Sequence, residues 1–393
     1  MKVTLIGSLP PQKGISPYVR ELAAALAARD DVDLEVLSFR SLYPRWLYPG
    51  GDPSDGTSTP PQIPSARLRN VLTWWNPLGW IIAGLSLRGY IVHAQWWSFF
   101  LAPAYITLLA LARLRGKRVI VTVHNAEPHE SGILRRLANR AVLPFAHRHV
   151  VHTEQNRRTL LTRGMSEQRI AVVPIGIGSP VRIDNKTARS ARQHMGLAKD
   201  APVVLFLGNI RPYKGLEDLL AAFRQVVNTL PEARLVIAGQ PWGKRDGLSE
   251  HIRRLGLQSA VLTRFEFIPD RAVADYFAAA DVAAYPYTHF DAQSAAVCDA
   301  LRHGCAIVVT NVGGLPDIVD DPAAVVPPGA ADLLAQALIR VLSDPALREK
   351  LEADSRRKAR ELSWETVAAA TAALYKECTP ESRLAPTATG ARR

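Results

Sequence analysis

The stretch Leu205-Phe-Leu-Gly-Asn-Ile-Arg-Pro-Tyr-Lys-Gly215 decides the fold of this 393-residue chain. An apolar run at residues 203–207 ends in Gly208, and the loop after it presents Arg211 and Lys214 three residues apart. A helical pattern follows, so this stretch is typical of the strand, turn and helix of a parallel sheet. Two cations at the carboxyl end of such a strand can neutralise a diphosphate. Taken alone, the same residues are equally compatible with a solvated basic turn.

Strand and helix patterns alternate in this way along both halves of the chain, which predicts parallel sheets covered on both faces. Expected strands outside the opening stretch include residues 3–6, 34–37, 91–94, 119–123, 235–238 and 282–285. A polar stretch at 179–200 interrupts the alternation, and we place a domain boundary at its start. The fold class is therefore α/β, with two doubly wound, Rossmann-like domains. We expect an N-terminal domain at 1–178 with a returning helix at 363–378, a C-terminal domain at 179–362, and a disordered tail at 379–393.

The charge balance of the chain is basic, with 48 Lys and Arg against 36 Asp and Glu. Such a surplus suits nucleic acid, an anionic membrane surface or a phosphorylated substrate. The sequence has neither a zinc-finger spacing nor the aromatic signature of an RNA-recognition motif, so we expect no nucleic-acid partner.

Three cysteines without a CxxC pair favour neither a disulfide framework nor a thiolate zinc site. The apolar run after Lys2 is too short for the hydrophobic segment of a signal peptide. We therefore expect a cytoplasmic protein.

Residues 71–87 and 89–112 carry no formal charge and hold five tryptophans. The first stretch is broken by Asn76-Pro77, and the second contains polar residues and predicts a buried strand, a loop and a helix rather than a membrane span. Tryptophans beside a basic surface are compatible with peripheral contact at lipid headgroups, on the inner face of the cytoplasmic membrane. An ordinary core with a cluster of acceptor loops explains the two stretches as well.

A second motif, His289-Phe-Asp-Ala-Gln-Ser-Ala-Ala-Val-Cys-Asp-Ala-Leu-Arg-His-Gly304, places Asp291 in a loop and Asp299 inside a helix. The free backbone amides at the start of that helix would point at an anion. These amides belong to Ser294, Ala295 and Ala296. Asp299 could accept hydrogen bonds from ribose hydroxyls, and Asp291 from hydroxyls of a sugar. The plainer alternatives are that Asp299 is an exposed helix residue and that Asp291 is a simple charge at the helix N-terminus.

Together the two motifs resemble those of GT-B fold glycosyltransferases of family 4, the glycosyl transferases group 1. The resemblance extends over residues 1 to 378. The resemblance implies that Arg211 and Lys214 bind the donor diphosphate and that Asp291 and Asp299 bind the donor sugar and the ribose. The family has glutamate at both acidic positions, and each aspartate is one methylene shorter. We therefore expect altered donor preference or reduced activity.

The N-terminal half carries the same resemblance in Leu9-Pro-Pro-Gln-Lys-Gly-Ile-Ser-Pro-Tyr-Val-Arg-Glu-Leu22 and Val121-Thr-Val-His-Asn-Ala-Glu-Pro-His-Glu130. It implies that Gly14 faces the donor phosphate and that His124 contacts the transferred sugar, although a lone histidine after a strand is more often structural. Lys13 stands where most members have a second glycine. We also assign Gly208 and Ile268 to the donor site, and Lys13, Tyr18, Glu127 and His129 to the acceptor site, with Glu130 as a weaker candidate.

The activity implied by the family is transfer of a hexose of the mannose or glucose type from a GDP- or UDP-linked donor to a glycan or lipid-linked acceptor. The expected setting is the assembly of cell-surface polysaccharide or glycolipid, with retention of configuration and with neither a cofactor nor a metal. Asp31-Val-Asp33 matches a metal-binding Asp-x-Asp string, but it lies in a short turn away from any diphosphate motif.

Three other classes remain open. A GT-B sugar epimerase would share the fold, and a nucleotide-sugar-binding protein with impaired catalysis would explain the paired aspartates. A dinucleotide dehydrogenase is disfavoured because no G-x-G-x-x-G follows the first strand.

Overall fold

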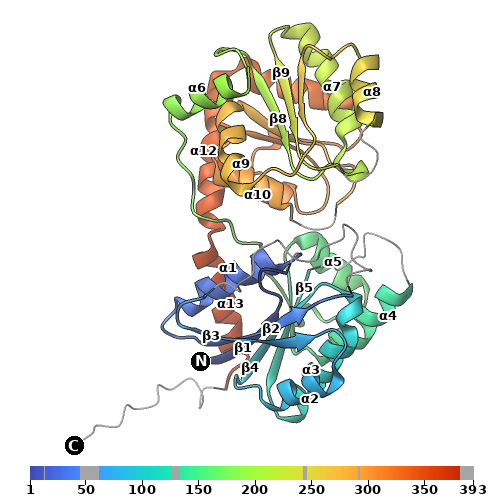
Figure 1. Cartoon of the computed structure of the whole chain (residues 1–393), viewed down its shortest axis with the longest axis vertical. Helices are drawn as coiled ribbons and strands as arrows, with labels where there is room; N and C mark the ends of the chain where they lie inside the picture. Colours follow the sequence, from blue (N-terminus) through green and yellow to red (C-terminus); the bar gives the residue numbers. More distant parts are fainter. Residues whose placement is uncertain (13, 45–61, 125–132, 242–245, 291–292, 381–393) are drawn as a thin grey trace, which may run out of the picture. The chain divides into compact units, whose positions relative to one another are not determined.

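The computed structural model describes residues 1–12, 14–44, 62–124, 133–241, 246–290 and 293–380. Its contacts divide the chain into two compact units, each with its own sheet (Figure 1). The N-terminal unit comprises Met1–Gly176 and Trp364–Arg393, and the C-terminal unit comprises Ile177–Ser363. The expected boundaries were 178/179 and 362/363.

The N-terminal unit is built on a seven-stranded parallel sheet of order β3-β2-β1-β4-β5-β6-β7. Val3 of the interior strand β1 (Lys2–Gly7) pairs with Leu34 on one side and with Ile91 on the other. The strands are β1 (Lys2–Gly7), β2 (Asp33–Ser41), β3 (Ala66–Thr73), β4 (Ile91–Trp96), β5 (Arg118–Val123), β6 (Arg148–Val151) and β7 (Ile170–Val172).

Helices cover both faces of this sheet because successive strand residues point to opposite sides. Val3 and Leu5 of β1 pack in one core with α1 and α13, whereas Ile6 packs in another with α2 and α3. The helices are α1 (Ser16–Ala27), α2 (Pro77–Leu85), α3 (Ala102–Leu114), α4 (Ile133–Val142), α5 (Glu154–Thr162) and α13 (Trp364–Glu377).

The C-terminal unit repeats the design with a six-stranded parallel sheet of order β10-β9-β8-β11-β12-β13. Its strands are β8 (Val203–Leu207), β9 (Arg234–Ala238), β10 (Val261–Arg264), β11 (Val282–Tyr285), β12 (Ile307–Thr310) and β13 (Val325–Val326). Its helices are α6 (Asn185–His194), α7 (Leu216–Thr229), α8 (Asp246–Arg254), α9 (Asp270–Ala279), α10 (Ala295–Arg302), α11 (Ala331–Ser343) and α12 (Pro345–Glu361). Short 3-10 turns occur at Phe99–Leu101, Leu143–Phe145, Glu167–Arg169, Pro212–Lys214, Pro316–Ile318 and Pro322–Ala324.

The prediction of an α/β fold with two doubly wound domains is confirmed. Part of the polar stretch at 179–200 is nevertheless helical, because Asp184 accepts a hydrogen bond from the Thr187 amide at 2.8 Å and caps α6. Ala191 of that helix is buried against Ala278 and Ala279. A single small apolar contact of this kind leaves little hydrophobic periodicity for a sequence reading to detect.

The uncharged stretch at 89–112 forms β4, a 3-10 turn and α3, as expected. Across the described residues, every helix is too short or too polar to cross a bilayer. All three cysteines are free thiols.

Candidate functional site

A cavity of about 380 Å³ opens at the carboxyl end of β8 in the C-terminal unit, and we call it the Lys214 cavity. Parallel α/β sheets bind ligands at this edge because the loops after the strands gather there. Eight residues assigned to the donor site from the sequence line this cavity: Gly208, Arg211, Lys214, Ile268, Ser294, Ala295, Ala296 and Asp299. Asp291, which was assigned to the same site, lies outside the described residues.

Two glycines bring the loop after β8 close to its neighbours. Gly208 has φ of +142°, and a Cβ there would lie 3.3 Å from Cβ of Ala296 at the start of α10. Gly215 has φ of +68°, and a Cβ there would lie 1.8 Å from the carbonyl oxygen of Pro286. Any other residue at Gly215 would push the loop away, so this glycine holds the Pro212–Lys214 turn against the end of β11.

Lys214 is the buried cation of the cavity, with 7% of its surface exposed. Its Nζ lies 3.9 Å from the centroid of the Tyr287 ring and donates a hydrogen bond to Oη of Tyr287. No carboxylate among the described residues pairs with it. Burial, with a smaller contribution from Arg211, lowers the pKa of Lys214 to about 7. A buried ammonium that faces only a phenol and aromatic rings gains most from an anionic ligand.

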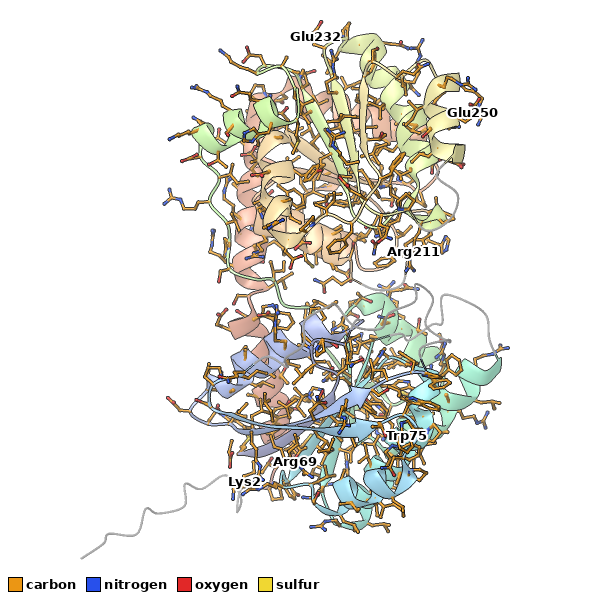
Figure 2. The ribbon with its side chains drawn as sticks, in the orientation of Figure 1. Lys2, Arg69, Trp75, Arg211, Glu232 and Glu250 are labelled. Carbon is orange, nitrogen blue, oxygen red and sulfur yellow. The ribbon has the colours of Figure 1, made fainter. Side chains whose placement is uncertain are left out.

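The start of α10 supplies further positive potential to the cavity. Ser294 is the N-cap of this helix, but its side chain does not cap the free amides; its Oγ lies 2.9 Å from Oη of Tyr287 instead. Ala295 and Ala296, the first two helical residues, also line the cavity. Uncapped amides and the helix dipole favour an anion at this position. Arg211, the residue before the Pro212–Lys214 turn, is labelled on the C-terminal unit in Figure 2.

Asp299 places a carboxylate in the same cavity, on α10 beyond the amides. Burial raises the pKa of Asp299 to about 6, while Arg302 lowers it and Asp270 raises it further. No side chain in the described part of the unit hydrogen bonds to this carboxylate. An ionised, unpaired carboxylate can accept hydrogen bonds from the hydroxyls of a ribose.

The cavity also has apolar and amide walls that the sequence analysis missed. Phe267, 69% exposed, and Phe290 line it, as do Asn209 and Gln240. Each of these residues lies in a loop near the carboxyl end of a strand, and this position was the signal that could have identified them. The sequence analysis also missed Tyr287, which follows β11, because only tertiary packing brings its side chain onto Lys214.

The N-terminal unit holds the other predicted residues, and its His124 is buried at the end of β5. Its Nδ1 lies 3.1 Å from Nε2 of His152, and its Nε2 lies 2.9 Å from Oε1 of Gln95. The ring of Tyr18 packs edge-on against His124 at 4.8 Å. Both ring nitrogens of His124 are therefore engaged within the unit, and a sugar hydroxyl would have to replace one of these partners.

This histidine belongs to a longer buried network. Gln95 also contacts His93, whose Nδ1 lies 2.7 Å from Oη of Tyr375 in α13. Burial lowers the pKa of His93 to about 3 and that of His152 to about 4, and it lowers the pKa of His124 well below the usual value. The network is thus uncharged at neutral pH and ties α13 to the sheet.

Gly14 lies in the loop after β1 with φ of +91° and no atom within 4 Å of a Cβ built on it. The left-handed backbone favours glycine at this open position. Lys13, Glu127, His129 and Glu130 lie outside the described residues.

In the Asp-x-Asp string, the Asp31 carboxylate forms ion pairs with Arg29 and Lys376. Oδ1 of Asp31 lies 3.0 Å from Arg29, and Oδ2 lies 2.9 Å from Lys376. These contacts, the hydrogen bond from Arg29 foremost, lower the pKa of Asp31 to about 2.

Comparison with known proteins adds independent evidence. The family model described as "Glycosyl transferases group 1" matches residues 188–358, and the "Glycosyl transferase 4-like domain" matches residues 13–176. The D-inositol 3-phosphate glycosyltransferase of Acidothermus cellulolyticus is 27% identical over 95% of this chain and 88% of the relative. The Xylanimonas cellulosilytica protein of the same name is 34% identical over 55% of this chain and 53% of the relative.

Two solved structures share the fold. Anabaena Alr3699/HepE, in complex with UDP and glucose, superposes with a TM-score of 0.73 at 17% identity, over 96% of this chain and all of the other. The sucrose-phosphate synthase of Thermosynechococcus elongatus superposes with a TM-score of 0.71 at 21% identity, over 96% of this chain and 99% of the other. Because the two family models together span most of the chain, this protein belongs to the glycosyl transferases group 1, the GT-B glycosyltransferases of family 4, and is a hexosyltransferase.

Proposed function

We propose that this protein transfers a hexose of the glucose or mannose type from a UDP- or GDP-linked donor to a glycan or lipid-linked acceptor. The observation that carries the proposal is the Lys214 cavity, in which a buried, carboxylate-free lysine, Arg211, the start of α10 and Asp299 meet. Anabaena Alr3699/HepE, which shares the fold, was solved with UDP and glucose and with UDP-glucose, which supports a nucleotide-sugar donor.

In the proposed mechanism, the donor diphosphate is held by Arg211, Lys214 and the α10 amides, and Asp299 holds the ribose hydroxyls. When the glycosidic bond breaks, negative charge develops on the departing diphosphate, and the same groups stabilise that charge. In other glycosyltransferases a metal neutralises the charge of the departing diphosphate. Arg211 and Lys214 would do so here, so we propose a metal-independent reaction. The departing phosphate would take the proton of the acceptor hydroxyl on the same face, which gives retention.

The residues outside this cavity have proposed roles as well. Asp291 would bind hydroxyls of the donor sugar, and Gly14 and His124 would contact the phosphate and the sugar from the N-terminal unit. We keep Lys13, Tyr18, Glu127 and His129 as proposed acceptor contacts. Tyr18 is half-buried, and its ring packs on His124 and Trp364, so this role requires the accessible part of its side chain.

For the acceptor, we propose a glycan carried at an anionic membrane surface, as in cell-surface polysaccharide or glycolipid assembly. The support comes from α2 (Pro77–Leu85), which has no charged residue and buries Trp80, Ala83 and Gly84. The opposite face of α2 exposes Leu78, Ile82 and Leu85, and Trp75, two residues before the helix, is exposed as well, with exposed fractions of 49% to 71% for the four. Figure 2 labels Trp75 on the N-terminal unit. We call these four residues the α2 face.

Two arginines, Arg69 and Arg115, lie at the C-terminal end of α2. Arg115 donates to the carbonyl oxygen of Leu85, and Nη2 of Arg69 donates to Oγ of Ser86 at 2.9 Å. Apolar anchors beside basic side chains match the acyl and headgroup layers of an anionic bilayer.

The experiment that tests the proposed function is a panel of nucleotide sugars screened for thermal stabilisation. A ligand that binds only the folded protein raises the melting temperature with its concentration. We expect UDP-glucose or GDP-mannose to do so, and to release its nucleoside diphosphate when acceptor lipid is added. Binding without any release would favour the alternative of a catalytically impaired nucleotide-sugar-binding protein, and conversion of the sugar to its epimer would favour the GT-B epimerase.

A further inference from the structure

The C-terminal unit contains a second cavity of about 890 Å³, which we call the basic groove. It lies among α6, the end of α9, the residues that follow α10, and α12. It shares no lining residue with the Lys214 cavity. Seven basic and three acidic side chains line it, so its balance of charge is positive.

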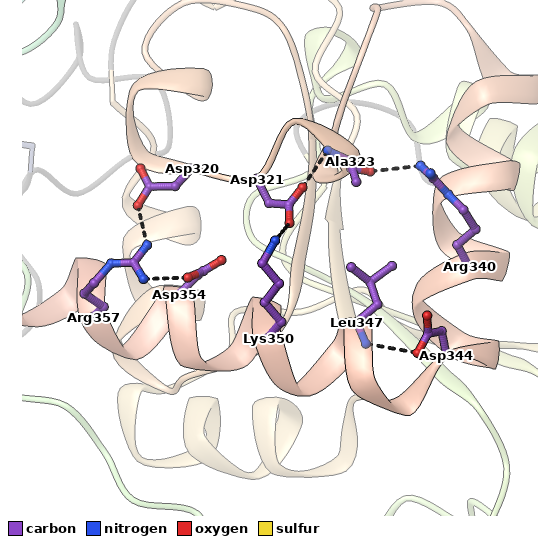
Figure 3. A network of polar contacts seen from close by, with 9 residues as sticks. All are labelled: Asp320, Asp321, Ala323, Arg340, Asp344, Leu347, Lys350, Asp354 and Arg357. Carbon is purple, nitrogen blue, oxygen red and sulfur yellow. Dashed lines mark hydrogen bonds and ion pairs between the residues drawn. The ribbon is translucent and has the colours of Figure 1, made fainter.

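One face of α12 supplies much of this charge. Arg348, Glu352, Arg356 and Arg360 follow one another at intervals of four residues, so they share a face of the helix, and all four line the groove. The cations elsewhere on α12 differ in their surroundings. Figure 3 shows Lys350 bound to Asp321 at 2.6 Å, and Arg357 bound to Asp320 and Asp354 at 2.8 and 2.6 Å. Away from the groove, the positive charge of α12 is thus matched by carboxylates.

The three acidic residues of the groove are already engaged. Asp281 accepts from Arg192 at 2.9 Å and from the Val203 amide at 2.8 Å. Asp184 caps α6, and Glu352 lies 3.5 Å from Arg356. By contrast, three arginines of the groove form neither an ion pair nor a hydrogen bond through their side chains with any residue of the described ranges. These are Arg182, Arg189 and Arg360.

A buried polar group completes the lining. His303 is 7% exposed and stacks on Phe277, with ring centroids 4.8 Å apart. Its Nδ1 donates to the carbonyl oxygen of Asp299 at 2.7 Å, because a carbonyl can only accept. Its Nε2 has no partner among the residues that the structure describes. Because Nδ1 carries the proton of the neutral ring, Nε2 is an acceptor, and it can accept a hydrogen bond from a hydroxyl group of a ligand in the groove.

We propose that the basic groove is a second ligand site, and that it binds a molecule bearing more than one phosphate group. Six of its seven cations are arginines, whose planar guanidinium groups bind phosphate oxygens in pairs. The groove has more than twice the volume of the Lys214 cavity, which leaves room for a ligand larger than one phosphate. Such a ligand is either a soluble phosphorylated sugar or the phosphorylated headgroup of a lipid.

The test uses calorimetric titration of the full-length protein with inorganic pyrophosphate at low salt. Pyrophosphate also suits the Lys214 cavity, so all variants carry Lys214→Ala to remove that site. We expect the Lys214→Ala protein to bind pyrophosphate, and Arg182→Gln with Arg360→Gln to weaken that binding at least tenfold. The matched control is Lys186→Gln with Arg224→Gln, which removes two exposed cations of the same unit that do not line the groove, and we expect less than a twofold change.

We call Arg182→Gln with Arg360→Gln the groove pair, and Lys186→Gln with Arg224→Gln the control pair. The proposal is overturned if the Lys214→Ala protein binds no pyrophosphate, or if the groove pair and the control pair bind pyrophosphate with the same affinity. In the protein with Lys214 intact, nucleotide-sugar binding by the groove pair verifies that the unit is folded. Failure of the donor site would be seen separately, as pyrophosphate binding in the groove without any nucleotide-sugar binding.

The source of the phosphates is decided by sedimentation with vesicles of cardiolipin, whose headgroup carries two phosphates, or of phosphatidylcholine. A lipid headgroup as ligand predicts that the groove pair weakens binding to cardiolipin vesicles and that pyrophosphate competes with them. A soluble ligand predicts that the groove pair sediments like the control pair while its pyrophosphate titration is still weakened.

Discussion

Lys214 donates a hydrogen bond to Oη of Tyr287, and the same ammonium lies 3.9 Å from the centre of the Tyr287 ring. Because the phenolic oxygen accepts from Lys214, its own proton is free to be donated to Oγ of Ser294, 2.9 Å away. The Ser294 proton is then directed to a ligand, since Ser294 lines the cavity and no other described group takes it. The Tyr287 hydroxyl thus orients both Lys214 and Ser294, at the start of α10, toward the same ligand.

Tyr287→Phe tests this arrangement because it keeps the ring and removes the hydroxyl. Two hydrogen bonds are lost, each contributing roughly 0.5–1.5 kcal/mol, so we expect nucleotide-sugar affinity to fall about 5- to 150-fold. Isothermal titration calorimetry measures the change. Tyr276→Phe is the control, since that tyrosine is half-buried in α9 and its hydroxyl forms no hydrogen bond with any residue that the structure describes. Equal affinities for the two variants would exclude a role for the Tyr287 hydroxyl.

The pH dependence of donor binding follows from Lys214 and Asp299. The pKa of Lys214 is about 7 in the empty cavity, and a bound diphosphate raises it, so affinity is constant below pH 7 and falls as pH rises above 7. The pKa of Asp299 is about 6, and ribose hydroxyls favour its ionised form, so affinity also falls as pH drops below 6. We expect the tightest binding between pH 6 and 7.

Calorimetry in two buffers of different ionisation enthalpy would detect the uptake of a proton on binding at pH 8. In Lys214→Met the alkaline fall should vanish while the acid fall remains. A wild-type affinity that is flat from pH 6 to 9 would contradict the assignment to Lys214.

Asp299 is predicted to bind the ribose as an ionised acceptor. Asp299→Asn keeps the shape but loses the charge, and a hydrogen bond to a charged group contributes roughly 1.5–3 kcal/mol, so we expect affinity to fall about 10- to 150-fold. Asp299→Glu introduces the residue typical of the family and should bind at least as tightly as the wild type. Titration of a 2′,3′-dideoxy nucleotide provides the control, because Asp299→Asn should then have little effect. An undiminished affinity of Asp299→Asn for the normal nucleotide would refute the ribose contact.

Most of the fold was predictable from the sequence, because buried parallel strands such as β8 and β11 are short apolar runs between helical patterns. The polar capped helix α6 and the half-exposed edge strand β3 lack such a signal and were missed. The motif residues at Arg211, Lys214 and Asp299 were identified because charged residues near strand ends are conspicuous. Tyr287 and His152 were not, because only tertiary packing brings the first onto Lys214 and the second onto His124.

The α2 face is predicted to bind anionic membranes. Leu78→Ser with Ile82→Ser removes two side chains that are 71% and 66% exposed, and burying each in lipid contributes at most about 1.5–3 kcal/mol. We expect sedimentation with phosphatidylglycerol vesicles to weaken at least tenfold. Leu137→Ser with Leu333→Ser, at exposed positions on α4 and α11, is the matched control. The membrane proposal fails if the control pair lowers binding as much as the α2 pair.

The most direct test of the central claim is the binding of UDP-glucose and GDP-mannose to the wild type and to Arg211→Ala with Lys214→Ala, measured by titration calorimetry at pH 6.5. We predict that one of these nucleotide sugars binds the wild type at a single site, and that the double variant loses at least a hundredfold in affinity while its fold is retained. Equal binding by both proteins, or binding to neither, would contradict the assignment of the Lys214 cavity as the donor site.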